Sequence, residues 1–135
     1  MARLQYYQRS RTNWTPASYS ANETATILPV GVGDLVGPLY GLMRTAFDGT
    51  GGRTISVGDG DDVDRYMTTT IGDVSQAAGT YLIAVGGSAS TYLAIGRHLY
   101  TAADTIDIVF VAATGGSPTA GAVDIWCWVA KVNPH

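Results

Sequence analysis

The chain has 135 residues, of which 46% are hydrophobic and 14% charged, and its formal net charge is −3. This length suits one domain. The charged fraction is well below the roughly 25% of an ordinary soluble domain, so we expect a surface that is rich in Thr, Ser and Gly or is covered by another protein. The single cysteine excludes an intrachain disulfide and a cysteine-based zinc cluster, and no apolar run approaches the roughly 18 residues that a membrane span requires.

The first segment, residues 1–22, is basic and aromatic. It contains three arginines and no acid, whereas residues 23–135 contain five basic and eleven acidic residues and a net charge of −6. Because a nucleic-acid reader normally carries its basic patch on the folded part, nucleic acid is not an expected partner. The segment shows no sustained period of 2 or 3.6 residues and no apolar stretch typical of a secretory signal. We therefore expect an extended N-terminal arm without a core of its own.

The remaining residues, 23–135, are expected to form one β-sandwich domain. Short β-rich runs alternate with turns rich in Gly, Asp, Ser and Thr, which is typical of a β-sandwich or jelly roll. Only residues 71–81 favour a helix, and the glycines within them would keep it short. The sequence thus predicts an all-β fold of antiparallel sheets. The expected strands lie within residues 24–30, 38–47, 53–59, 81–87, 91–100, 105–114 and 122–132.

The last run, "AVDIWCWVAKV", is apolar on both of its faces. Alternation places Ile125, Cys127, Val129 and Lys131 on one face and Trp126, Trp128, Ala130 and Val132 on the other. We therefore expect this strand to be buried on both sides, against the core and against a neighbour. The same patterning predicts a core that includes Ile27, Leu42, Phe47, Ile55, Val57, Leu82, Val85, Ile95, Ile108, Phe110 and Val129.

The densest cluster of charge is the stretch "GDGDDVD" at residues 58–64. A calcium loop of the EF-hand type requires oxygen ligands at positions 1, 3 and 5, glycine at 6 and glutamate at 12. Counted from Asp59, position 5 is a valine and position 12 a threonine, so this motif is absent. A looser cation site made by Asp59, Asp61 and Asp62 is the weaker alternative. The flanking glycines favour a solvated turn between two strands.

No catalytic constellation is recognisable, so we expect a non-enzymatic protein without cofactors. The glycine-rich pieces "DGTGGR" and "TGGSPTAG" lack the lysine of a phosphate-binding loop, and the chain has no G-x-S-x-G elbow. His98 is the only internal histidine, which favours a structural or surface role. Cys127, between two tryptophans, is typical of a small core residue and not of an activated thiolate.

The aromatic residues of the β-rich part allow two interpretations. They could form a stacking platform for a sugar or a base, or they could pack in the core and in subunit contacts, where aromatic side chains dominate the energetics. We favour packing, and we predict that the chain associates with itself, as a homotrimer. The residues concerned are Tyr92, Tyr100, Trp126 and Trp128.

Three short elements carry a resemblance to a known class of protein. They are "TAFDG" at Thr45–Gly49, "VGD" at Val57–Asp59 and "TAG" with a following valine at Thr119–Val123. With the order of the runs between them, over roughly residues 23–132, the chain resembles small virion proteins encoded by tailed bacteriophages. The resemblance implies a capsid decoration, or cement, protein that oligomerises on the phage head and clamps neighbouring capsomers. A receptor- or glycan-binding module of a fibre or tail tip is the alternative.

The same resemblance implies a location on the capsid surface of the virion, with synthesis in the host cytoplasm. The implied partners are the major capsid protein and further copies of the chain itself, with neither membrane nor nucleic acid. The basic arm lies outside the shared pattern. Because arginine pairs bidentately with carboxylates and aromatic side chains fill grooves, we expect the arm to bind the shell or an adjacent subunit and to be disordered in the isolated protein. The expected contact residues are Arg3, Tyr6, Tyr7, Arg9, Arg11 and Trp14.

Overall fold

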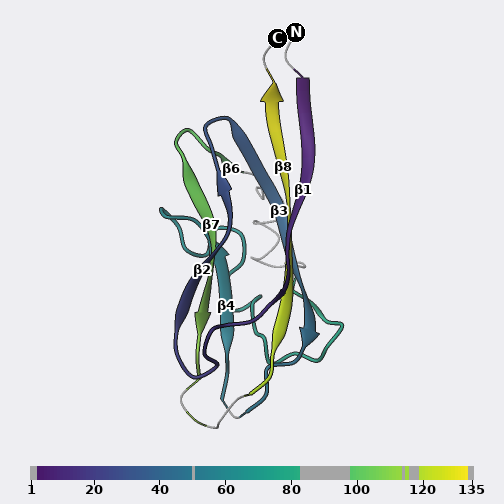
Figure 1. Cartoon of the computed structure of the whole chain (residues 1–135), viewed down its shortest axis with the longest axis vertical. Coiled ribbons are helices and arrows are strands. Elements are labelled where there is room, and N and C mark those ends of the chain that lie inside the picture. The colour runs from purple at the N-terminus through teal and green to yellow at the C-terminus, as the bar shows by residue number, and fades with distance from the viewer. Residues whose placement is uncertain (1–2, 50, 83–97, 114, 116–118, 134–135) are drawn as a thin grey trace.

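The computed structural model describes the chain except for residues 1–2, 50, 83–97, 114, 116–118 and 134–135, and its described part contains two antiparallel sheets (Figure 1). The larger sheet has the order β1-β8-β3-β5, with β6 also paired to β3, and the smaller has the order β2-β7-β4. None of the described residues is helical, so none forms a helix that could span a membrane. The strands are β1 (Arg3–Trp14), β2 (Glu23–Val30), β3 (Asp34–Thr45), β4 (Thr54–Gly58), β5 (Tyr81–Leu82), β6 (His98–Leu99), β7 (Asp104–Val111) and β8 (Ala122–Asn133).

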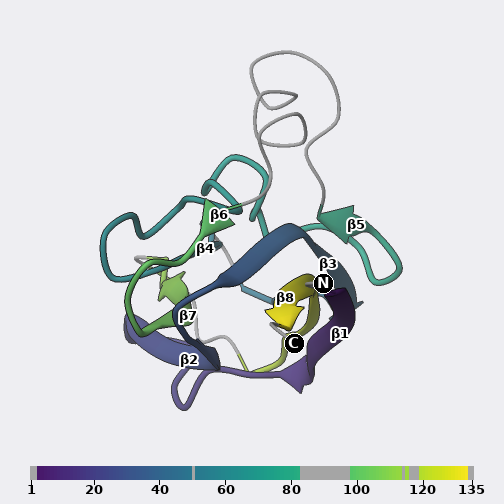
Figure 2. The ribbon, with the colours of Figure 1, turned by 90° about the horizontal axis from the view of Figure 1, so that it is seen from above.

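The two sheets face each other, as the view along the strands shows (Figure 2). The prediction of an all-β fold with two antiparallel sheets is confirmed. The prediction of a short helix at residues 71–81 is wrong. Those residues form turns, and a residue larger than glycine at Gly72 would meet the Ile55 carbonyl oxygen at 1.9 Å. The Ile55 amide donates to the Gly72 carbonyl at 2.8 Å, so this segment packs along the edge of β4 instead of coiling into a helix.

Strand β8 lies at the centre of the larger sheet, with β1 on one side and β3 on the other. Its residues Ile125, Cys127 and Val129 point into the core and are buried, as alternation predicts. The expectation of burial on both sides is wrong at Trp128, which is 40% exposed. The smaller sheet covers one face of β8, so the opposite face keeps part of its aromatic surface open.

The core lies between the sheets and contains most of the residues that the sequence pattern predicts. Ile27 and Leu42 are only partly buried, because Ile27 sits where the register of β2 shifts and Leu42 stands opposite Asp124, on the outer side of the larger sheet. Val85 and Ile95 lie outside the described residues. The buried members of the predicted set are Phe47, Ile55, Val57, Leu82, Ile108, Phe110 and Val129.

Residues 3–14, within the segment expected to be an extended N-terminal arm, form β1 at the edge of the larger sheet. The strand pairs with β8 from Arg3 to Arg11, and after a register shift Trp14 pairs with Val123. Asn13, at the shift, has a φ of 52°, and its amide donates to Asp124 Oδ1 at 2.6 Å. This β-bulge turns Trp14 into the core, where it packs edge-on against Phe110.

Candidate functional site

The acid-rich turn after β4 is organised around one buried carboxylate, that of Asp59, which is 3% exposed. Its Oδ2 accepts hydrogen bonds from Arg65 Nε and the Tyr100 hydroxyl, each at 2.7 Å. Its Oδ1 accepts from the amides of Asp61 and Asp62, at 3.1 and 2.9 Å. Burial by itself raises the pKa of Asp59, but the bonds from Tyr100, Arg65 and Asp62 outweigh it and leave the pKa below its ordinary value. Asp59 therefore acts as the anchor that closes the turn.

Two tyrosines and a histidine extend this network. The hydroxyls of Tyr66 and Tyr100 lie 2.8 Å apart, and burial raises the pKa of both, so both stay neutral. His98 Nδ1 lies 3.3 Å from Arg65 Nη1, and its ring packs edge-on against Tyr100. The network holds the turn against the start of β3 through the Tyr100 amide, which donates to the Asp34 carbonyl. This placement agrees with a structural role for His98.

The weak cation candidates Asp59, Asp61 and Asp62 are not assembled as a binding site. Both oxygens of Asp59 already accept from protein donors, and Asp61 is exposed. In the part of the chain that the structure describes, no group of three or more His, Cys, Asp or Glu side chains is arranged to hold a metal ion.

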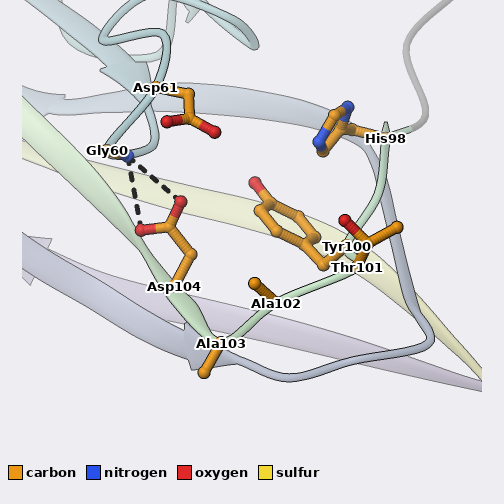
Figure 3. A pocket seen from close by; sticks show the side chains of 8 residues that line it. All are labelled: Gly60, Asp61, His98, Tyr100, Thr101, Ala102, Ala103 and Asp104. Atoms are coloured by element: carbon orange, nitrogen blue, oxygen red, sulfur yellow. Dashed lines mark hydrogen bonds between the residues drawn. The ribbon is translucent and has the colours of Figure 1, made fainter.

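A shallow pocket of about 350 Å³ opens beside this turn. Figure 3 shows the Asp104 carboxylate pointing at the Gly60 amide, which donates to both of its oxygens at 3.3 Å, and not toward His98. Among the described residues of the lining, the Tyr100 hydroxyl donates to Asp59, and no hydrogen bond joins a hydroxyl group to the His98 ring. Its lining residues are Gly60, Asp61, His98, Tyr100, Thr101, Ala102, Ala103 and Asp104.

Two of the three elements that carry the phage resemblance meet at the opposite end of the molecule. Asp48 Oδ1 accepts from the amides of Thr119 and Ala120 at 2.8 and 2.9 Å, and its Oδ2 accepts from the Thr119 hydroxyl at 3.0 Å. Gly121, with a φ of 152°, sits against the ring of Phe47, and a Cβ there would lie 2.3 Å from the ring. These motif residues connect the loop after β3 to the start of β8, so their role is structural.

The other residues that the sequence analysis considered for a functional role also lie in structural environments. Burial raises the pKa of the Cys127 thiol to about 11, which matches a core residue. Trp126 stacks on Tyr40 of β3, with ring centroids 5.4 Å apart. Tyr100 belongs to the core cluster. Tyr92 lies outside the described residues.

Strand β1, which carries the proposed contact residues, lies at the outer edge of the larger sheet, where β8 is its only partner among the described strands (Figures 1 and 2). Tyr7 is 37% exposed, and Arg9 and Arg11 are exposed on the same face. The Arg9 guanidinium lies 5.5 Å from the centre of the Tyr7 ring, a cation–π contact. Trp14 is 5% exposed and belongs to the core, so it is not available to a partner.

The backbones of Arg3 and Tyr6, the other two proposed contacts, also lie in β1, while their side chains are outside the description.

Comparison with known proteins finds a likeness of fold. No protein-family model matches the chain, and no curated protein matches its sequence. The fold is similar to a chain of the cyanophage Pam1 capsid asymmetric unit, with a TM-score of 0.55, 16% identity and coverage of 98% of this chain and 86% of that chain. It is also similar to a chain of the acidic stable capsid structure of the Helicobacter pylori bacteriophage KHP30, with a TM-score of 0.56, 12% identity and coverage of 100% and 95%.

Proposed function

We propose that the protein is a non-enzymatic structural component of a bacteriophage virion, a decoration protein that oligomerises on the head and clamps neighbouring capsomers. The observation that carries this proposal is the likeness of fold to chains of two phage capsid structures, which extends over nearly the whole chain in both. The sequence elements at Thr45–Gly49 and Thr119–Val123, which resemble those of phage virion proteins, support the same assignment because they form one joint in the fold.

The surface of the molecule supports a role in assembly. A chain with few charges exposes Tyr7, Tyr81, Leu99 and Trp128, and aromatic residues are enriched in protein interfaces. We propose that copies of the chain associate as a trimer on the capsid surface, and that the major capsid protein is the second partner. In this arrangement β1, which residues 3–14 form, contacts the shell or an adjacent subunit with its free edge.

The copy number of the chain in purified particles tests this function. Quantitative mass spectrometry together with a cryo-EM reconstruction should find hundreds of copies distributed over the head, with contacts between copies. A few tens of copies or fewer, placed at a tail or fibre, would overturn the decoration role and favour the receptor-binding module.

A second experiment tests the arm. Particles that lack the protein are mixed with the intact chain or with a chain that begins at residue 12, which keeps Trp14 in the core. Loss of binding by the shortened chain is the expected result. Undiminished binding would show that attachment does not depend on residues 1–11 and that the rest of the β-sandwich carries it.

A further inference from the structure

We propose that the free edge of β1 binds an acidic, extended segment of a different protein, which adds to the larger sheet as a further strand. The inference rests on the proposed function in one respect, because it takes the protein of the capsid shell to be the source of that segment. The binding chemistry itself depends on β1 alone.

The edge of β1 is long and open. It has twelve residues without a proline, and β8 is the only one of the described strands that pairs with it. An unpaired strand edge presents a row of backbone N–H and C=O groups, which is a template for a further strand. The edge of β4, by contrast, is covered by the bridges Thr54–Asp73 and Val57–Met67, and β5 is two residues long. Of the larger sheet's described strands, β1 offers the longest exposed edge.

The charge on β1 defines the partner. Arg9 and Arg11 stand two residues apart, so their side chains share one face and are separated by about 6.8 Å along the strand. No carboxylate among the described residues forms an ion pair with either of them. An added strand with acidic residues at alternate positions would place its carboxylates directly beside these guanidinium groups. The partner is therefore an acidic segment with a period of two.

A second copy of the chain does not supply such a segment. Pairing of β1 with β1 of another copy would bring arginines close to arginines, which is destabilising. The edge strand of the smaller sheet, β2, has Glu23 as its one acid, and this carboxylate accepts a hydrogen bond from the Ala17 amide at 2.6 Å. The acid-rich turn does not supply one either, because its residues form bends and turns and not an extended strand, and Asp59 is enclosed by its own hydrogen bonds. The occupant is thus another protein.

A peptide-binding experiment on the full-length chain tests the inference. The probe is a blocked, fluorescently labelled nine-residue peptide in which aspartate alternates with valine and threonine, and the matched control replaces each aspartate with asparagine. Fluorescence anisotropy should show binding of the acidic peptide at least about tenfold tighter than that of the control, with the difference reduced by salt. Equal binding of the two peptides would overturn the role of charge.

Charge reversal on the protein provides a second test. The double substitution Arg9→Glu with Arg11→Glu should weaken binding of the acidic peptide at least about tenfold. A peptide with lysine in place of each aspartate should bind this variant more tightly than the acidic peptide does. Because both side chains are exposed, the variant should melt at the same temperature as the original chain. A variant that still prefers the acidic peptide would contradict the proposed location.

Backbone methylation separates strand addition from simple ion pairing. Two versions of the acidic peptide are N-methylated, one at its odd and one at its even positions. Only every second amide of an added strand faces β1, so one version should lose binding and the other should keep it. Equal affinities would overturn strand addition.

These peptide results do not depend on where the protein sits in the particle. If the peptide fails to bind while hundreds of copies cover the head, the inference is wrong and the decoration role stands. If the peptide binds while the protein is found at the tail, the decoration role is wrong and the edge site stands.

Discussion

The acid-rich turn after β4 and the basic strand β1 are the two most charged regions of the molecule, and they use their charge in opposite ways. The turn directs its central carboxylate inward, where Asp59 accepts four hydrogen bonds from Arg65, Tyr100 and two backbone amides. Strand β1 directs Arg9 and Arg11 outward, where no described carboxylate pairs with them. A dense cluster of charge therefore marks a structural joint in one case and an open surface in the other, and burial distinguishes them.

The sharpest test of this contrast is the substitution Asp59→Asn. The amide keeps the shape of the carboxylate but leaves the Arg65 guanidinium without its partner, so we expect a loss of about 3–5 kcal/mol in the free energy of unfolding. Urea denaturation measures this loss. The matched control is Asp61→Asn, an exposed aspartate two residues away, which should change stability by less than about 0.5 kcal/mol. Similar losses in the two variants would contradict the assignment of Asp59 as the anchor.

Trp14 and Tyr7 divide β1 into an anchored end and an open end. Trp14→Ala removes a ring that packs on Phe110, and a loss of about 3 kcal/mol is expected. Tyr7→Ala removes a partly exposed ring and should cost less than about 1 kcal/mol. Thermal unfolding of both variants gives the comparison, and a larger loss for Tyr7→Ala would reverse our description of the strand.

The acid dependence of stability provides a smaller but more specific signal. The pKa of Asp59 is lower in the folded protein than its ordinary value of 3.8, so its contribution to stability is present above that value and is lost as the pH falls through the lower folded pKa. The difference in unfolding free energy between the original chain and Asp59→Asn should therefore shrink as the pH falls from neutral toward about 2. A difference that is independent of pH in this range would show that the carboxylate charge is not what stabilises the turn.

The smallest effect on stability is expected at the open end of β1. Replacing Arg9 and Arg11 with glutamate changes the free energy of unfolding by less than about 0.5 kcal/mol, because both side chains are exposed and form no ion pair with a described carboxylate. Denaturant titration measures this change in the free energy of unfolding. A loss above about 2 kcal/mol would mean that these arginines stabilise the sandwich itself, which the structure does not indicate.

Patterning predicted those parts of the fold in which one face of a strand meets the core. Ile125, Cys127 and Val129 alternate along β8 and are buried as expected. Patterning failed for β1, because its residues from Tyr7 to Asn13 are exposed on both faces and show no alternation of polar and apolar types. A strand held only at the edge of a sheet by backbone hydrogen bonds leaves no hydrophobic period in its sequence.

The sequence by itself determined the class of the fold, the absence of a recognisable catalytic motif and the separation of a basic beginning from an acidic remainder. Only the tertiary structure decided which charges are inside. Asp59 and Asp61 are both aspartates in one turn, yet only the first is enclosed, by the nearby Arg65 and by Tyr100, which lies 41 residues further along the chain. Composition and local pattern specify what a residue is able to do, while desolvation and the arrival of distant partners determine what it does.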